Sequence, residues 1–204
     1  MTFGSLRITF DDRVLRPRGW TTAQSRWAAE LLPELPSGSV LELCAGAGQI
    51  GLLAVAGTDR LLVCVDASEA ASDFTRSNAC TAGLADQVEV RNARLEDALG
   101  AAETFPLIIA DPPWVPRHET GQFPEDPLTA IDGGDDGLDV ARACLLVIDA
   151  HLSPRGSALV QLGTAEQARL LAADQSMTSG SIELGEIKQF DRGVVVRLDR
   201  SRDA

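Results

Sequence analysis

The chain has 204 residues, 45% of them hydrophobic and 24% charged, which is typical of one soluble domain with a core large enough to fold unaided. It contains neither an apolar run of about eighteen residues nor a signal-peptide pattern, so we expect a cytoplasmic protein without a membrane partner. Its net charge of −12 disfavours long nucleic acid as a partner, because proteins that bind polyanions normally carry a basic field.

Residues 1–35 predict one short strand and one helix. Ser5 to Phe10 alternates apolar and polar residues, as a strand does. A threonine-capped helix is expected from about Ala23 to Leu32, where Pro33 ends it. Trp27 belongs to an apolar stripe at four-residue spacing, which is more often core than ligand site. No domain boundary is visible, so residues 1–35 are interpreted as an N-terminal extension of a single domain, 1–204.

A glycine-rich turn follows the first buried strand, which we expect from Ser39 to Leu43. Gly46 and Gly48 allow the backbone to approach a ligand closely, and the helix that begins after them offers free N–H groups. This arrangement predicts a site for a nucleotide-like cofactor at the carboxyl end of the strand. Because Gly46-x-Gly48-x-x-Gly51 also matches the dinucleotide fingerprint, and Asp66 ends the next strand, an NAD-binding oxidoreductase is one alternative.

The rest of the chain alternates strands with helices. The apolar run from Leu107 to Ala110 is typical of a central strand that is covered on both faces. The other strands and helices are expected at Leu61–Asp66, Glu69–Ala82, Val88–Val90, Gly137–His151, Ser157–Leu162, Ala165–Ala173, Ile182–Phe190 and Gly193–Leu198, the last two as an antiparallel pair. This pattern predicts a doubly wound α/β fold in three layers, with a mostly parallel sheet of about seven strands whose last strand is antiparallel.

The most specific feature is Asp111-Pro112-Pro113-Trp114, directly after the apolar strand. Two prolines fix an extended backbone and remove two N–H donors, which leaves the Asp111 carboxylate and the Pro112 carbonyl as acceptors beside an aromatic ring. Two acceptors suit the –NH2 group of an amide or a base amine, because holding both hydrogens directs the nitrogen lone pair at an electrophilic methyl group. Trp114 would then stack on a planar substrate, although D-P-P also occurs as a simple turn.

Four features together resemble the class I S-adenosylmethionine methyltransferases: Glu42 in the strand, the Gly46-x-Gly48 turn, Asp66 and the D-P-P-W motif. The resemblance implies a Rossmann-like fold, with Glu42 at the amino group of the cofactor and Asp66 at its ribose hydroxyls. Asp66 also stands where it could cap the following helix. The expected catalytic residues are Asp111, Pro112, Pro113 and Trp114, and the expected cofactor contacts are Thr21, Glu42, Cys44, Ala45, Gly46, Gly48, Gln49, Asp66, Ala67, Asn92 and Asp111.

Further segments occur in the order seen in HemK/PrmC-type methyltransferases, which modify a glutamine amide in peptide release factors. They are Val14-Leu15-x-Pro17-Arg18-x-x-Thr21, Asn78-Ala79 and Gly133-Gly134-x-Asp136-Gly137-Leu138, and the resemblance covers roughly residues 14–163. It implies S-adenosylmethionine as the cofactor and a planar nitrogen of a protein glutamine or a small molecule as the acceptor. It also implies that the N-terminal extension covers the cofactor site.

The chain departs from that family pattern in several places. Asp111 and Trp114 stand where the family has asparagine and tyrosine, which makes the motif similar to that of nucleic-acid amino-methyltransferases acting on adenine N6 or guanine N2. Gly19-Trp20 and Thr22 replace the family's residues around Thr21. A nucleic-acid amino-methyltransferase is therefore the first alternative, before the NAD-binding oxidoreductase and a non-catalytic binding subunit.

Cysteine usage and one long segment complete the expectations. No metal site is expected, because the cysteines lie far apart and only two histidines are present. The cysteines are interpreted as reduced, buried residues. The segment from Pro116 to Asp136 is long for a loop in a compact domain and is expected to gate the substrate. The sequence leaves open whether the protein is a monomer or a homodimer.

Overall fold

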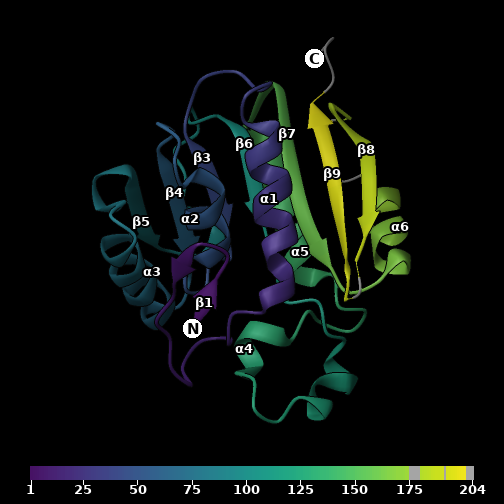
Figure 1. Cartoon of the computed structure of the whole chain (residues 1–204). Coiled ribbons are helices and arrows are strands. Elements are labelled where there is room, and N and C mark those ends of the chain that lie inside the picture. The colour runs from purple at the N-terminus through teal and green to yellow at the C-terminus, as the bar shows by residue number, and fades with distance from the viewer. Residues whose placement is uncertain (175–179, 191, 201–204) are drawn as a thin grey trace.

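The computed structural model describes residues 1–174, 180–190 and 192–200, which form a three-layer α/β fold (Figure 1). One sheet contains β3 (Val40–Leu43), β4 (Leu62–Asp66), β5 (Val88–Asn92), β6 (Phe105–Ala110), β7 (Leu152–Leu162), β8 (Ile182–Gln189) and β9 (Val194–Arg200). Their order is β5-β4-β3-β6-β7-β9-β8, with parallel pairing from β5 to β7. β9 runs antiparallel to both of its neighbours, so the predicted fold is confirmed.

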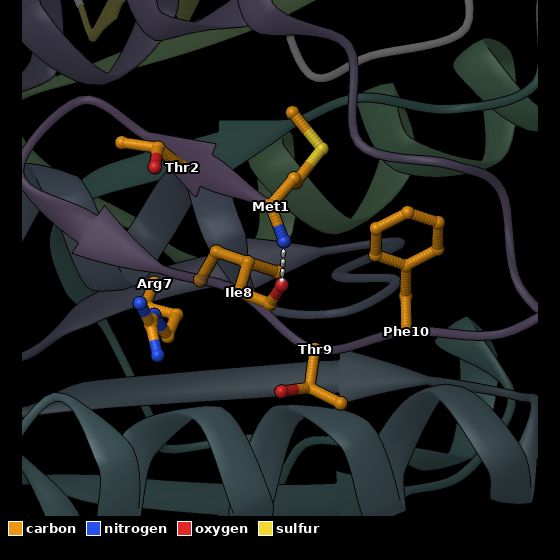
Figure 2. Close-up of a pocket in the computed structure, with 6 residues that line it drawn as sticks. All are labelled: Met1, Thr2, Arg7, Ile8, Thr9 and Phe10. Atoms are coloured by element: carbon orange, nitrogen blue, oxygen red, sulfur yellow. Dashed lines mark hydrogen bonds between the residues drawn. The ribbon is translucent and has the colours of Figure 1, made fainter.

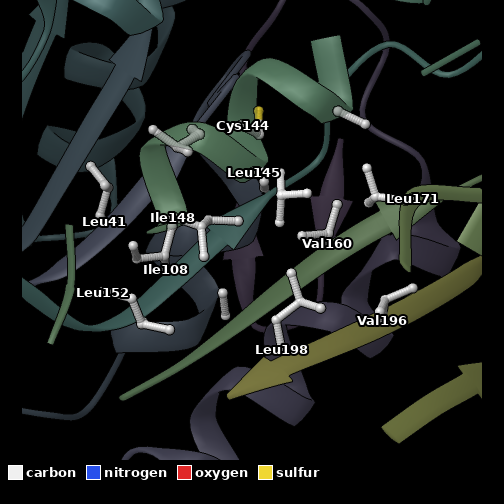
Figure 3. Close-up of a cluster of buried hydrophobic side chains, with 14 of the residues drawn as sticks. Leu41, Ile108, Cys144, Leu145, Ile148, Leu152, Val160, Leu171, Val196 and Leu198 are labelled. Carbon is white, nitrogen blue, oxygen red and sulfur yellow. The ribbon is translucent and has the colours of Figure 1, made fainter. Parts of the chain in front are cut away.

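Helices cover both faces of the sheet (Figure 1). One face carries α1 (Thr22–Leu31), α2 (Gln49–Val55) and α3 (Glu69–Thr81), and the other carries α5 (Asp139–His151) and α6 (Ala165–Ala173). Successive side chains of β6 alternate between the two cores: Leu107 and Ile109 pack toward α1 and α2, and Ile108 packs toward α5. Figure 3 shows the α5 core, where Ile148 and Leu145 lie over the strands. Burial on both faces explains why β6 is uninterruptedly apolar.

Two predictions for the N-terminal residues are wrong in detail. Instead of one strand from Ser5 to Phe10, the structure has a separate hairpin of two short strands, β1 (Thr2–Phe3) and β2 (Leu6–Arg7). The threonine before α1 does not cap it with its side chain. The Thr21 hydroxyl instead donates to the Arg18 carbonyl at 2.9 Å, which closes the short 3-10 turn that precedes the helix.

The segment from Pro116 to Asp136 has secondary structure of its own, contrary to the expected loop. It contains a 3-10 helix over Arg117–Gln122 and the short helix α4 (Leu128–Ile131). Arg18 donates to Asp126 at 2.5 Å, which ties this segment to the N-terminal residues. The segment lies near the carboxyl ends of the parallel strands (Figure 1). Its role as a substrate gate stays a prediction.

The other elements lie within two residues of their predicted bounds, with the exception of β7. β7 begins at Leu152 instead of Ser157, because the turn-forming residues before Ser157 make an irregular start to the strand. Its register against β6 shifts there, and Arg155 adopts a φ of +63°. No helix in the described residues is long and apolar enough to span a membrane.

The four cysteines are free thiols, but their environments differ from the expectation. Cys64 and Cys144 are buried as predicted, whereas Cys80 is exposed on α3. Cys44 is half-buried, and its Sγ lies 3.9 Å from Cys144 Sγ. The interpretation of every cysteine as a buried apolar residue is therefore wrong for Cys80.

Candidate active site

The carboxyl ends of three neighbouring strands meet at one edge of the sheet. β3 pairs in register with β4 on one side and with β6 on the other, so Cys44, Asp66 and Asp111 follow side by side. From β3 the strand order continues through β4 to β5 on one side of the sheet, and from β6 it continues to β8 on the other side. The direction of the strand order therefore switches between β3 and β6. Ligands of open α/β sheets bind at such a switch point, at the carboxyl ends of the strands.

The turn after β3 has the left-handed backbone that its glycines predicted. Gly46 and Gly48 have φ values of +57° and +75°, and Cys44 also has a positive φ, of +56°. A Cβ on Gly48 would lie 2.8 Å from Thr75 Cγ2, whereas a Cβ on Gly46 would meet no atom within 4 Å. The turn is therefore packed on one side and borders open space at Gly46.

Asn78 connects this turn to the N-terminal segment. Its Nδ2 donates to the carbonyls of Ala47 and Thr9, both at 2.9 Å, and its Oδ1 accepts from Thr9 N at 2.8 Å. The side chain is fully buried, so these bonds replace hydration that it loses on folding. The Asn-Ala pair of the sequence pattern thus has a structural role in fixing the turn.

Asp66 holds the glycine turn and the start of α3 together. Its Oδ2 accepts from Gly46 N and its Oδ1 from Ser68 N, each at 2.8 Å. Burial raises the pKa of this carboxyl, and the two backbone donors oppose the increase. Each oxygen keeps a lone pair for another donor, so the structural role leaves room for ribose hydroxyls. The ribose contact itself stays a prediction.

Glu42 lies behind the turn and is only 2% exposed. Its Oε1 accepts from Gly51 N at 2.9 Å, and Cys64 Sγ donates to its Oε2 at 3.3 Å. Burial, with the nearby charges of Asp111 and Asp66, raises the pKa of Glu42 to about 7. The structure therefore gives Glu42 a role in fixing α2 beneath the turn. Its contact with a cofactor amino group stays a prediction.

The remaining predicted cofactor contacts differ in their exposure. Thr21 is 2% exposed and Ala45 is buried, whereas Ala67 is exposed. Asn92 is exposed and donates through Nδ2 to the Asp66 carbonyl at 3.0 Å. Gln49 begins α2, and its buried Oε1 has no hydrogen-bond partner among the described residues. Asn92 and Ala67 thus lie beside Asp66 at the end of β4, and Gln49 brings a buried, unpaired acceptor to the turn after β3. Thr21 instead directly precedes α1, whose Gln24 reaches β6 and β7.

The D-P-P-W motif directly follows β6. It provides two hydrogen-bond acceptors that have no donor among the described residues, and an indole ring that packs against the protein. No hydrogen bond in the described part of the chain uses the Asp111 carboxylate or the Pro112 carbonyl. Burial raises the pKa of Asp111 to about 7. The ring of Trp114 lies against Gly163, where an added Cβ would come within 2.4 Å of its Cε3. The indole therefore packs against the backbone just after the end of β7.

The segment from Gly133 to Leu138 supports the backbone just after this motif. Gly133 N donates to the Val115 carbonyl at 2.9 Å, and Val115 N donates to the Ile131 carbonyl at 3.0 Å. A Cβ on Gly137 would lie 2.3 Å from the Trp114 carbonyl oxygen, so only glycine fits there. The Gly-Gly-x-Asp-Gly-Leu pattern is thus a scaffold for the D-P-P-W motif.

Two buried glutamines that sequence reasoning missed also hold this edge. Gln167 Nε2 donates to the Trp114 carbonyl at 2.8 Å, and the same side chain completes a capping box with Thr164. The T-x-x-Q spacing is a signal that could have revealed Gln167. Gln24 Nε2 donates to the Ala110 carbonyl at 2.9 Å, directly before Asp111. No local pattern predicts that contact, because the two residues are 86 positions apart.

A hollow of about 440 Å³ lies at the N-terminal hairpin (Figure 2). The Met1 ammonium group donates to the Ile8 carbonyl at 2.6 Å beside it. None of the residues predicted to bind the cofactor lines it; its walls are Met1, Thr2, Arg7, Ile8, Thr9 and Phe10. We therefore assign the candidate site to the carboxyl edge and not to this hollow.

Comparison with known proteins decides between the interpretations of this edge. The model of the methyltransferase small domain matches residues 23–130, more than half of the chain. The chain belongs to the methyltransferase small-domain family. This assignment, together with the D-P-P-W motif, favours the methyltransferase interpretation over an NAD-binding oxidoreductase.

Two relatives extend the comparison beyond the domain match. The ribosomal protein uL3 glutamine methyltransferase of Francisella tularensis is 30% identical over 81% of this chain and 55% of its own length. The release factor glutamine methyltransferase of Deinococcus radiodurans is 32% identical over 84% of this chain and 62% of its own length. The chain thus spans somewhat more than half the length of these relatives. The predicted HemK/PrmC-type resemblance is confirmed.

Solved structures confirm the fold. The hMettl16 catalytic domain in complex with MAT2A 3′UTR hairpin 1 superposes with a TM-score of 0.72. The match covers 97% of this chain and 75% of that one, at 16% sequence identity. This likeness shows a shared class I methyltransferase architecture.

The family's methyl donor is S-adenosylmethionine, and the residues at the carboxyl edge fit it. Open space borders Gly46, and Asp66 has acceptor capacity for hydroxyl groups. Gln49 offers a buried oxygen without a partner, and Asp111 offers a carboxylate without a donor. A ligand that carries hydroxyl groups and an ammonium group supplies the donors that these acceptors lack.

Proposed function

We propose that this chain is an S-adenosylmethionine-dependent N-methyltransferase that modifies the side-chain amide of a protein glutamine. The observation that carries the proposal is the pair of acceptors at the end of β6, the Asp111 carboxylate and the Pro112 carbonyl, which face no donor among the described residues. The two relatives are glutamine methyltransferases, which supports an amide nitrogen as the acceptor.

In the proposed reaction, the two acceptors each take one N–H of the target amide. They hold the nitrogen in place while the rigid backbone of Pro112 and Pro113 keeps them in position. S-adenosylmethionine, when bound, supplies an electrophilic methyl group on a sulfonium. As the bond between the nitrogen and the methyl carbon forms, the bond between that carbon and the sulfonium sulfur breaks and leaves its electron pair on the sulfur, and the nitrogen loses a proton. Asp111 is the group placed to accept that proton, because burial has raised its pKa to about 7.

The remaining predicted residues take supporting roles in this proposal. Trp114 presents a flat ring to the planar amide, and contact with Gly163 helps to hold that ring in place. Asp66 receives the ribose hydroxyls beside the Gly46 turn. Residues 1–35 cover the cofactor, and the bonds from Asn78 to Thr9 support that placement. We keep the cytoplasm as the expected compartment.

A nucleic-acid amino group is the second candidate acceptor. Asp111 in place of the family's asparagine favours it, because nucleic-acid enzymes of this class carry the same D-P-P-aromatic motif. The net charge of −12 opposes it. The segment from Pro116 to Asp136, which follows the motif, adds to that opposition with acidic residues such as Glu125 and Asp135, which would repel phosphates.

A labelling experiment tests the proposal. Purified protein is incubated with S-adenosylmethionine labelled in its methyl group and with a cell extract divided into protein, nucleic-acid and small-molecule fractions. We expect label in a discrete protein band, on a glutamine by mass spectrometry. Asp111→Ala should abolish it, and the control Asp73→Ala should not, because that side chain is 69% exposed on α3. Label confined to nucleic acid would show that the proposed acceptor is wrong.

A further inference from the structure

The sheet ends at β8, whose outer edge has no partner among the described elements (Figure 1). The residues from Glu183 to Ile187 are all exposed, and Leu184 and Ile187 are each 39% exposed. A long edge strand with exposed apolar side chains is a template for another strand. The sequence and register of β8 determine which strand fits it.

β8 contains a β-bulge in its middle. Its register against β9 shifts between Leu184 and Ile187, so that Gly185 and Glu186 together face one residue of β9. A Cβ on Gly185 would lie 2.5 Å from Asp199 Oδ2, so a larger residue at this point would displace the Asp199 side chain. The extra residue changes the alternation of faces along the strand.

The bulge sorts the side chains of β8 into two pairs. Leu184 and Ile187 lie on the same face, because their β9 partners both belong to the core beneath α5 and α6. Glu183 and Lys188 share the opposite face, where Lys188 Nζ lies 3.9 Å from the centroid of the Trp27 ring. Each face thus carries one residue on either side of the bulge.

The bulge also determines which backbone groups point outward. At the hairpin end, Phe190 N donates to the Gly193 carbonyl at 3.1 Å. Backbone groups alternate in direction along an antiparallel ladder, and the alternation along β9 is unbroken. It follows that the β8 residues whose backbone groups point away from β9 are Ile182, Leu184, Ile187 and Gln189.

We propose that β8 pairs with β8 of a second copy of this chain, antiparallel, about a two-fold axis between Gly185 and Glu186. In this register Leu184 meets Ile187 of the second copy on one face, and Glu183 meets Lys188 of the second copy on the other. The symmetry makes each contact twice. An apolar pair and an opposite-charge pair directly across two strands both stabilise the pairing.

The positions of the outward groups support this register. Leu184 pairs with Ile187, and Ile182 with Gln189, so every outward residue meets another outward residue. In a strand without the bulge, the same register would set outward groups against inward ones, and no ladder could form. Bulges and lysines on edge strands also serve to prevent pairing. Here both features instead fit one symmetric partner.

Charge reversal tests the proposal by sedimentation velocity over a wide range of protein concentration. Wild-type protein should form a dimer. Glu183→Lys or Lys188→Glu alone sets like charges against each other twice and should weaken dimerisation about tenfold or more. The control Glu125→Lys makes the same change in charge as Glu183→Lys at an exposed position far along the chain and should leave the dimer intact.

Mixing the two single variants is the decisive step. Each variant pairs badly with itself, but a mixed dimer again sets opposite charges face to face, so an equal mixture should dimerise as the wild type does. Misfolding cannot produce that rescue, and circular dichroism confirms the fold of each variant. A wild type that stays monomeric, a single variant that dimerises normally, or a mixture that is not rescued would each overturn the proposal.

Discussion

Replacing Glu42 by glutamine should make the protein more stable in mild alkali. The pKa of Glu42 is raised by burial from 4.5 to about 7. An acid whose pKa is higher in the folded state does not lower the free energy of unfolding while it is neutral in both the folded and the unfolded state, below about pH 4.5. The cost grows as pH rises toward the folded pKa and is complete above it. At about 1.4 kcal/mol for each pKa unit, the full cost is about 3 kcal/mol.

Urea unfolding of wild type and Glu42→Gln at acid, neutral and alkaline pH measures this difference. The variant keeps an acceptor for Gly51 N, so we expect nearly equal stability at pH 4.5 and an advantage of about 3 kcal/mol at pH 8.5. Glu30→Gln, at an exposed position on α1, is the control and should show no such pH dependence. A difference between variant and wild type that does not change with pH would refute the argument.

Three further predictions concern the D-P-P-W edge. Asp111→Asn should remove the rise in kcat/KM through about pH 7 that the wild type shows as Asp111 loses its proton, which a pH–rate profile measures. Gln167→Ala leaves the Trp114 carbonyl without its donor and should lower the free energy of unfolding by about 1–3 kcal/mol in urea titrations. Gly163→Ala would press a Cβ against the indole and should raise KM for the acceptor, whereas Gly121→Ala, where a Cβ meets nothing within 4 Å, should not.

Local patterns were sufficient to predict most elements of the fold. The apolar run of β6 and the glycines after β3 depend on residues that are adjacent in sequence, and both were located correctly. The start of β7 was placed too late because Pro154 and Gly156 usually mark a turn, whereas here they begin a strand with an irregular register. Pairing with a neighbouring strand overrode the local preference.

The candidate site was predictable in its residue types but not in its contacts. Asp66 and Asp111 were identified from their positions after strands, and the register of the sheet sets them on either side of the turn. The orientation of Glu42 toward Gly51 depends on how closely α2 packs on β3, which no sequence pattern reports. Gln24 was missed for the same reason, because its partner belongs to a distant strand.

The three carboxylates at this edge, those of Glu42, Asp66 and Asp111, differ in whether the protein itself supplies a hydrogen-bond donor to them. Glu42 and Asp66 each accept hydrogen bonds from donors of the protein itself, which offsets part of the cost of their burial. Burial raises the pKa of Asp111 to about 7, and this carboxyl has no such donor among the described residues; because the residue is half-buried, its oxygens stay open to solvent or to a ligand. Its acceptors are therefore available to a ligand, and an –NH2 group between Asp111 and the bare carbonyl of Pro112 would satisfy both acceptors at once.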